Sequence, residues 1–230
     1  MGRSSESAPG WEAIERSLGA LYGDQEPLHW APDVPPMLGG AYPFHGLSLY
    51  RSERHSRHWH AVTFGLSELF GKDSDDPDVS GFGFELTLRL PRVAAEDDIR
   101  RASQLLAPLG QYVRKTGNRF GHGHRIPMNF QTQMPGTKLG GIALCLDPEL
   151  GRIETPHGRL EFLQLVGITR DELDTLREAQ GSSDCLFRAL ERGHPLLVMD
   201  FDRGSVLDDP ESRREVEACL EHRSTELSER

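Results

Sequence analysis

The sequence lacks both a cysteine pattern and a long apolar run. Its three cysteines are far apart and form no Cys-x-x-Cys pair: Cys145, Cys185 and Cys219. This odd number at wide spacing predicts neither a disulfide framework nor a zinc knuckle. No stretch approaches the roughly 18 apolar residues that span a membrane, and the polar N-terminus is unlike a signal peptide. These absences predict a cytoplasmic protein that does not associate with membranes.

Basic residues are also under-represented. The 230 residues include 26 Lys and Arg against 36 Asp and Glu, a net charge of −10. A protein that binds the phosphate backbone of nucleic acid needs the opposite balance, so nucleic acid is not expected as a partner. Solubility accounts for most of this charge, and attraction of a basic protein partner is the alternative.

Motifs of catalysis and cofactor binding are missing as well. Residues 135–138 lack the upstream glycine of a phosphate-binding loop, and no Gly-x-Ser-x-Gly elbow is present. The acidic loop at 73–78 does not match a calcium-binding EF-hand. Counted from Asp73, the sixth position is Asp78 and the twelfth is Phe84, where an EF-hand needs glycine and glutamate. Cys145 lies in an apolar stretch and is expected to pack, not to react. The sequence therefore predicts no cofactor and no enzymatic activity.

The ten histidines leave a metal site as an alternative. His58 and His60 share one face of a predicted strand, and His122 and His124 form a second His-x-His pair. Two such pairs could hold zinc or iron. Because no cysteine or carboxylate stands at a ligand spacing, the main interpretation is structural or hydrogen-bonding histidines, without a metal.

The order of the expected elements indicates an α+β fold with a mixed, mostly antiparallel sheet covered by helices. No Pro/Gly/Ser-rich linker or internal repeat divides the chain. We therefore expect one domain over residues 9–207, a disordered N-terminus over 1–8, and a charged C-terminal helix or tail over 208–230.

Periodicity and capping residues place the elements. Helices are expected over 11–22 and 99–113, from Thr169, and from Ser182 or Ser183. Pro108 should kink the second of these, and the Pro-rich segment 27–43 should be irregular. Strands are expected at 47–51, 59–64, 82–90, 142–146, 152–155, 159–166 and 195–201.

Residues 58–90 are the most informative stretch. They contain His-Trp-His at 58–60, Gly-Leu-Ser-Glu-Leu-Phe-Gly at 65–71, an acidic loop, and Ser-Gly-Phe-Gly-Phe-Glu-Leu-Thr at 80–87. Every second residue from Phe82 to Leu90 is large and apolar, which predicts a strand with one face in the core. Gly65 is expected at a strand end, in a turn or bulge. Together these pieces closely resemble the Suppressor of fused family, whose N-terminal domain has the same run.

Three further segments resemble that family in the same order. They are Leu-Tyr-Gly-Asp-Gln at 21–25, Leu-Gly-Gly through Leu-Tyr-Arg at 38–51, and Thr-Pro-His-Gly through Phe-Leu-Gln-Leu-Val-Gly at 155–167. The resemblance spans residues 10–206 and implies the fold of the family's N-terminal domain. Animal members carry a second domain beyond it, so this chain is expected to be a stand-alone version of the N-terminal half.

The resemblance also implies a binding function. Animal members hold Gli-type transcription factors as an extended peptide that adds a strand to sheet edges, and short bacterial members are proposed to be immunity proteins. The family's peptide contacts include a tyrosine, matched here by Tyr112, and an acidic residue that this chain replaces with His124. Without that carboxylate, Gli-type binding is not expected.

The main expectation is a non-catalytic cytoplasmic module that binds a protein or extended peptide, as a bacterial immunity protein against a basic toxin domain. One alternative is an intracellular regulator or adaptor that binds an endogenous peptide or transcription factor. The other is a metal-dependent enzyme that uses the four histidines of the two His-x-His pairs.

Two surfaces are expected to contact the partner. The first is the glycine- and histidine-rich loop from Asn118 to Gln133 with the preceding helix end, because exposed loops often carry function. Its named contacts are Tyr112, Asn118, Phe120, His122, His124 and Arg125. The second is the acidic loop, through Asp73, Asp75 and Asp76. A flexible connection and a solvated loop are the respective alternatives.

Overall fold

The computed structural model describes residues 7–93, 95–130 and 134–228. Most of the predicted disordered N-terminus and the end of the predicted contact loop, residues 131–133, lie outside the described residues. The chain forms two compact units: unit 1 is residues 1–120 and 146–164, and unit 2 is residues 121–145 and 165–230. A single domain over 9–207 stays a prediction.

The strands follow the order β1-β2-β3-β4-β8-β6-β5, with β7 paired to β8. Every pair whose register is described is antiparallel. Unit 1 contains β1 (Leu28–Trp30), β2 (Gly46–Ser52), β3 (His58–Phe64), β4 (Val79–Pro91), β7 (Arg152–Thr155) and the first part of β8 (Gly158–Thr169). Unit 2 contains β5 (Arg125–Pro127), most of β6 (Leu139–Leu146) and the end of β8. With helices beside the sheet, the predicted α+β class is confirmed.

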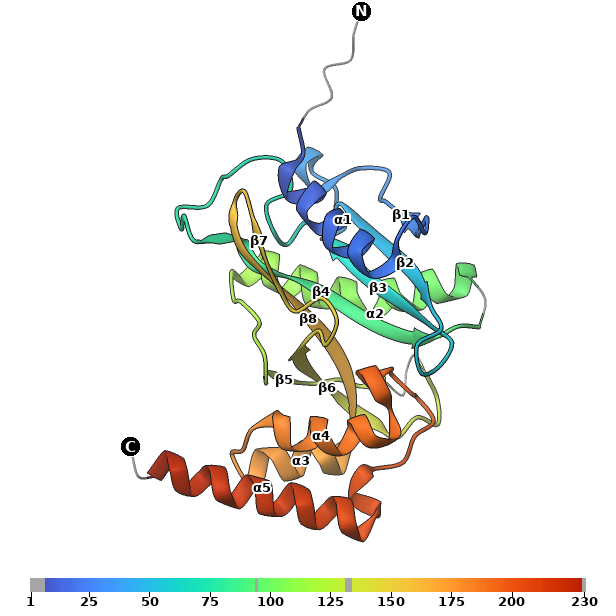
Figure 1. Cartoon of the computed structure of the whole chain (residues 1–230), viewed down its shortest axis with the longest axis vertical. Helices are drawn as coiled ribbons and strands as arrows, with labels where there is room; N and C mark the ends of the chain where they lie inside the picture. The colour runs from blue at the N-terminus through green and yellow to red at the C-terminus, as the bar shows by residue number, and fades with distance from the viewer. Residues whose placement is uncertain (1–6, 94, 131–133, 229–230) are drawn as a thin grey trace, which may run out of the picture. The chain divides into compact units, whose positions relative to one another are not determined.

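The two α-helices of unit 1 lie on opposite faces of its sheet (Figure 1). α1 (Pro9–Tyr22) buries Ile14 against a cluster that includes Val62. α2 (Ala95–Thr116) covers the other face, where the buried indole N–H of Trp59 donates to Asp98 at 2.8 Å. Successive strand side chains alternate in direction, so Trp59 and Val62 point to different faces. Both helices were predicted; the kink at Pro108, which lies inside α2, stays a prediction.

β4 is buried on both faces, although the sequence predicted only one face in the core. Its apolar residues are buried as expected: Phe84, Leu86, Leu88 and Leu90. The polar residues between them, Glu85, Thr87 and Arg89, are also fully buried. The register places Arg89 opposite His60 of β3, on the face that α1 covers. The second face of β4 is buried because α1 packs over it. The alternation of apolar and polar residues along one strand cannot show such a contact between elements.

Unit 2 packs three helices around its own core. α3 (Arg170–Glu178) begins at the predicted capping box, where the Thr169 amide donates to the Glu172 carboxylate at 2.8 Å. α4 (Ser183–Gly193) begins after Ser182, whose hydroxyl accepts from the Asp184 amide. α5 (Pro210–Ser228) contributes Val216 and Leu220 to this core. The buried core residues of these three helices include Leu173, Leu176, Leu186, Leu190, Val216 and Leu220.

A disulfide joins two of these helices, and the expectation of no disulfide was wrong. Cys185 of α4 and Cys219 of α5 are bonded, with their Cα atoms 5.7 Å apart and 34 positions apart in the sequence. Cysteines on separate helices meet only through packing, so their spacing carries no signature. Cys145, in β6, is buried as expected.

Two backbone predictions were also wrong. The apolar segment at 195–201 was expected to be a strand, but it starts with the 3₁₀ turn Pro195–Leu197 and pairs with no described strand. Leu196 and Leu197 have φ of 59° and 52°, which a regular strand cannot accommodate. The Pro-rich segment 27–43 contains β1 and the 3₁₀ turn Pro36–Leu38. Short apolar runs of this kind do not distinguish a strand from other buried structure.

Among the described residues, none of the helices combines the length and apolar character that crossing a membrane requires.

Candidate functional site

An open cleft of about 510 Å³ lies in unit 1, between the end of α2 and the loop that precedes β4. Its walls come from residues 65–74, from Gly81 and Phe82 of β4, and from Arg114 and Arg119 at the end of α2. Asp73 of the acidic loop also lines it. The cleft therefore borders both surfaces that the sequence predicts as contacts, because Arg119 stands between Asn118 and Phe120.

Glu68 holds the loop that forms one wall of the cleft. Its carboxylate accepts from the backbone amides of Asp73 and Ser74, each at 2.6 Å, and of Gly81 at 3.0 Å. Lys72 Nζ donates to it at 2.9 Å. Burial alone would raise the pKa of Glu68, but these donors outweigh burial and lower the pKa to about 2. The wall is thus tied to an ionised carboxylate at neutral pH.

A second carboxylate, on the buried Glu85, fixes the strand end at Gly65. It accepts from the amides of Gly65 and Ser67 at 2.7 and 2.9 Å, and from the hydroxyls of Ser67 and Thr63 at 2.6 and 2.7 Å. Burial raises the pKa of Glu85, although these bonds oppose it. Gly65 has φ of 125°, and a Cβ there would lie 2.7 Å from the His45 ring, so only glycine fits. The predicted strand end at Gly65 is confirmed.

Arg114 joins α2 to the same turn. Its guanidinium donates to the carbonyl oxygen of Gly65 at 2.6 Å and to that of Pro43. Burial lowers the pKa of His45, and the nearby Arg114 lowers it further. His45 is therefore neutral at neutral pH, and the positive charge at the cleft comes from Arg114 and Arg119.

Loop and helix also meet through backbone contacts beside the cleft. The amides of Gly10 and Trp11, in the first turn of α1, donate to the Leu69 carbonyl at 3.0 and 3.2 Å. A Cβ on Gly10 would lie 1.9 Å from the Glu68 carbonyl oxygen, so α1 can approach this closely only with glycine. The cleft loop therefore caps the start of α1.

Three of the predicted contact residues form one cluster at the end of α2. The rings of Tyr112 and Phe120 are stacked, with centroids 5.6 Å apart and an interplanar angle of 20°. The Asn118 side-chain amide donates to the Tyr112 hydroxyl at 2.9 Å. Tyr112 is 44% exposed and Phe70, in the cleft wall, is 39% exposed. Large exposed aromatic side chains are typical of protein contacts. The role of this cluster in binding stays a prediction.

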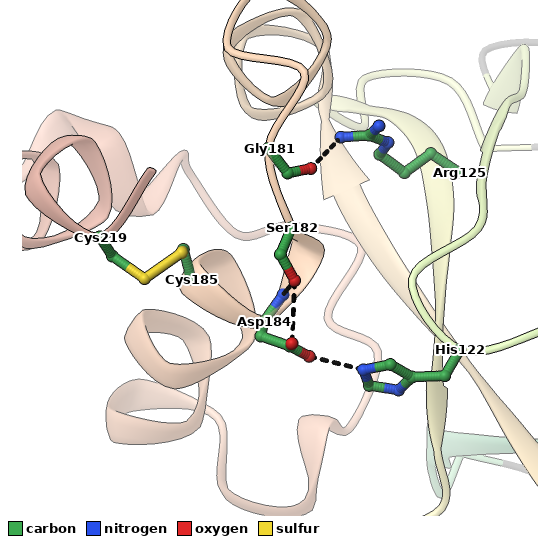
Figure 2. The surroundings of a disulfide bond; sticks show 7 residues. All are labelled: His122, Arg125, Gly181, Ser182, Asp184, Cys185 and Cys219. Atoms are coloured by element: carbon green, nitrogen blue, oxygen red, sulfur yellow. Dashed lines mark hydrogen bonds and ion pairs between the residues drawn. A yellow bond between two sulfur atoms is a disulfide. The ribbon is translucent and has the colours of Figure 1, made fainter. Parts of the chain in front are cut away.

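The other three residues of this predicted surface belong to unit 2 (Figure 2). His122 Nε2 lies 2.5 Å from Asp184 Oδ1, at the start of α4. Arg125 is in β5, not in a loop, and its guanidinium donates to the carbonyl oxygens of Leu176 and Gly181 at 2.8 and 2.9 Å. His124 shares backbone hydrogen bonds with Gly121 and Leu144. Arg125 thus has a structural role, and the predicted surface is divided between the two units.

The acidic loop is mostly solvent-exposed. Asp73 and Asp75 are exposed, and Asp76 is half-buried and accepts the Asp78 amide at 3.0 Å. Of the three predicted residues, Asp73 alone lines the cleft. Binding of a basic partner by this loop stays a prediction.

Sequence reasoning missed a buried polar network around Arg89. Its guanidinium contacts both Asp147 oxygens, at 2.8 and 3.2 Å, and a Glu149 oxygen at 2.8 Å. His60 Nε2 lies 3.0 Å from Asp147, and its Nδ1 lies 2.8 Å from the Tyr22 hydroxyl of α1. Burial opposes ionisation of Asp147, but His60 and Arg89 hold its pKa well below the usual range. The one available signal was the polar residue at every second position of β4.

The His-x-His pairs are engaged in local contacts. His60 belongs to the Arg89 network, and burial lowers the pKa of His58 to about 4. His58 Nδ1 donates to the Ser56 carbonyl at 2.9 Å, while its Nε2 is buried without a hydrogen bond among the described residues. No group of three or more His, Cys, Asp or Glu side chains suited to a metal ion is found in the described part of the chain.

Comparison with known proteins gives one consistent answer. Residues 40–204 match the family model described as Suppressor of fused protein (SUFU). The Suppressor of fused homolog of Homo sapiens is 32% identical over 237 residues, which cover 95% of this chain and 49% of that protein. The chain thus spans about half the length of the curated relatives it matches.

Solved structures agree with the sequence match. The chain is similar to one in the Sufu–Fu complex, with a TM-score of 0.80, 30% identity, and coverage of 91% of this chain and 98% of that one. Similarity to Drosophila Suppressor of Fused has a TM-score of 0.82 and 30% identity, over 94% of this chain and 55% of that one. The family model covers well over half of the chain, and the resemblance in residues 58–90 lies within it. The chain belongs to the Suppressor of fused family.

Proposed function

We propose that this chain is a protein-binding module that binds a segment of a partner protein in the cleft between the end of α2 and residues 65–74. The observation that carries the proposal is the construction of the cleft. Two hydrogen-bonded carboxylates, Glu68 and Glu85, hold its walls in place, and the exposed ring of Phe70 lines it. The related Sufu chain has been solved in complex with Fu, which supports a protein as the partner.

The chemistry of the walls suits a peptide better than a small apolar molecule. The lining alternates apolar groups such as Phe70 and Phe82 with charged groups such as Arg119 and Asp73. A pre-formed surface of this kind loses little conformational entropy on binding. The module then acts by binding and masking a segment of its partner, without catalysing a reaction.

Two cleft variants test the location of the site. Phe70→Ala and Arg119→Glu should each weaken binding to the partner by about tenfold, because buried aromatic and arginine contacts dominate interfaces. Val34→Ala is a matched control, since Val34 is 51% exposed in unit 1 and lies outside the cleft lining. Isothermal titration calorimetry would measure the change. Equal affinity of all three variants would place the site elsewhere.

We further propose that the partner is a basic toxin and that the chain is a cytoplasmic bacterial immunity protein. The net charge of −10 and the exposed acidic loop support this, because they would steer a basic partner toward the chain. Co-expression with the product of the neighbouring gene should give a stable complex and protect the cells from that product. If no complex forms and the cells are not protected, the immunity role is ruled out.

A regulator or adaptor for an endogenous peptide is the second candidate, favoured by the solved complex of a relative with Fu. Pull-down from cells that lack the neighbouring gene separates the two roles. Recovery of the same cellular protein with wild-type chain, and its loss with Phe70→Ala, would favour the adaptor.

A further inference from the structure

A second, basic pocket of about 460 Å³ lies at the opposite end of β4 from the cleft. Phe82 lines the cleft and Arg92 lines this pocket, so about ten residues of extended chain, roughly 30 Å, separate the two sites. The pocket also contains Arg51 from β2 and Arg57 from the loop before β3. Three guanidinium groups thus meet in one place on a chain whose net charge is −10.

Acidic groups within the pocket only partly offset these charges. Asp98 is the one acidic side chain among the described residues of the lining. Its Oδ2 accepts from the Trp59 indole at 2.8 Å and from the Val93 amide at 2.9 Å, and its Oδ1 lies 3.6 Å from Arg101. Asp98 therefore serves the fold at the start of α2, and the three arginines keep a positive excess.

An exposed carboxylate of the chain itself shows what these arginines can hold. Glu53 Oε1 lies 2.7 Å from Arg92 Nη1, and Glu53 Oε2 lies 3.4 Å from Arg57 Nε. One carboxylate thus bridges two guanidinium groups. Glu53 is 64% exposed at its side chain, and exposed ion pairs of this kind contribute little stability. A second carboxylate can therefore replace it at small cost.

The remaining groups are set to receive such a ligand. The Arg92 guanidinium stacks on Trp59, 5.2 Å from the ring centroid, which restricts its orientation. The guanidinium of Arg51 forms no hydrogen bond or ion pair with any described residue and is exposed. Val93 is 75% exposed beside them. The pocket offers paired donors for a carboxylate next to an apolar contact.

From this arrangement we infer that the pocket of Arg51, Arg57 and Arg92 binds an acidic peptide segment, with a glutamate or aspartate beside an apolar residue, from a partner protein. Glu53 occupies the carboxylate position in the unbound chain and competes with the ligand. This site is separate from the proposed cleft and does not depend on it. Arginine suits it because its planar donors match both carboxylate oxygens.

Substitution of Glu53 gives the sharpest test, because loss of this side chain should strengthen peptide binding, whereas most substitutions in a binding site weaken it. A fluorescein-labelled peptide of alternating glutamate and leucine would be titrated with the full chain and followed by anisotropy. Glu53→Gln should tighten binding by about two- to fivefold, because the peptide then no longer has to displace the exposed carboxylate that bridges Arg57 and Arg92. Arg92→Gln should weaken it by about tenfold or more, and Arg57→Gln by at least about threefold. Arg57 is 74% exposed at its side chain, so its substitution leaves the fold intact.

Two exposed α1 residues provide matched controls. Glu12→Gln and Arg16→Gln make the same charge changes outside the pocket and should leave affinity unchanged. The same peptide with glutamine in place of glutamate should not bind. Weaker or unchanged binding by Glu53→Gln would overturn the inference, as would equal effects of Arg57→Gln and Arg16→Gln. Displacement of the peptide by inorganic phosphate at equal concentration would also overturn it, in favour of a small-anion site.

Discussion

Arg89 carries a positive charge that has no access to water, since its side chain is fully buried on the α1 face of the sheet. Such a charge is tolerated only when it is paired and hydrogen-bonded. Asp147 and Glu149 supply that pairing, and His60 links the network to Tyr22 of α1. The network therefore links β3, β4 and α1 to residues 147–149.

Removal of one partner from this network should be costly. Asp147→Ala leaves the Arg89 charge without its main partner, and we expect a loss of about 3–5 kcal/mol in the free energy of unfolding. The double variant Arg89→Met with Asp147→Leu should lose less than the single one, because no unpaired charge remains. Urea denaturation would measure both. A loss in the double variant as large as that in Asp147→Ala, or larger, would show that the unpaired Arg89 charge is not what makes the single variant costly.

His58 gives stability a dependence on pH. Its pKa is about 4 in the folded chain against an ordinary value of 6.5, because burial disfavours the cation. The unfolded chain binds the extra proton as pH falls below 6.5, so stability present at pH 7 is lost on acidification. Between pH 7 and pH 5 the loss from His58 should be on the order of 2 kcal/mol.

Substitution isolates this contribution from those of the other histidines. His58→Asn keeps a side-chain donor for the Ser56 carbonyl but cannot be protonated. Thermal or urea unfolding at several pH values should show a flatter decline between pH 7 and pH 5 than in the unsubstituted chain. Parallel curves for the two proteins would contradict the shifted pKa.

At the scale of elements, periodicity and capping residues predicted most of what forms. The predicted strands at 47–51, 59–64, 82–90, 152–155 and 159–166 are all present, as are the helices that start after Thr169 and Ser182. What failed depends on contacts between elements. The second buried face of β4 requires α1, the disulfide requires the packing of α4 on α5, and residues 195–201 require left-handed backbone at Leu196 and Leu197.

The same limit applies to the candidate site. Tyr112, Asn118 and Phe120 form a cluster because they are close in sequence at the end of one helix. The sequence could not show that Glu68 accepts hydrogen bonds that hold the cleft loop. Its donors lie within residues 72–81, which fold back around its carboxylate. Nor does the sequence show that Arg125 is held by carbonyl groups of Leu176 and Gly181.

The disulfide should contribute much of the stability of the C-terminal helix. Over residues 210–222, where its side chains are described, α5 buries only Val216 and Leu220, beside the partly buried Cys219. A cross-link over 34 positions is worth about 3–4 kcal/mol in the chain-entropy model. Cys185→Ser should therefore lower the free energy of unfolding by about that amount. Cys145→Ser is a control that leaves the disulfide in place; an equal loss in both would show that burial of sulfur, not cross-linking, is responsible.

For the whole molecule, the division into two units makes a prediction about local stability. α4, α5 and the disulfide all belong to unit 2, whereas the Arg89 network belongs to unit 1. Reduction with dithiothreitol should speed hydrogen exchange at amides of α4 and α5 and leave those of β2 to β4 unchanged. Mass spectrometry of exchanged peptides would show this. Uniform acceleration over both units would mean that they unfold as one.

The whole chain is acidic, yet its candidate contact surfaces are not uniform in charge. The cleft combines Arg114 and Arg119 with Asp73, and the pocket at the far end of β4 gathers three arginines. A net charge of −10 would attract a basic protein at long range, whereas recognition at short range depends on the local charged groups. This distinction could not be drawn from composition.

The cleft has one more consequence, which concerns the N-terminal end of the chain. The Leu69 carbonyl that borders it also receives the first two amides of α1, and Gly10 lies directly against Glu68. Any shift of that loop on ligand capture must pull on the opening turn of the helix. A dye placed just ahead of Pro9 would accordingly sense occupancy, and a bulky affinity tag fused there would interfere with it.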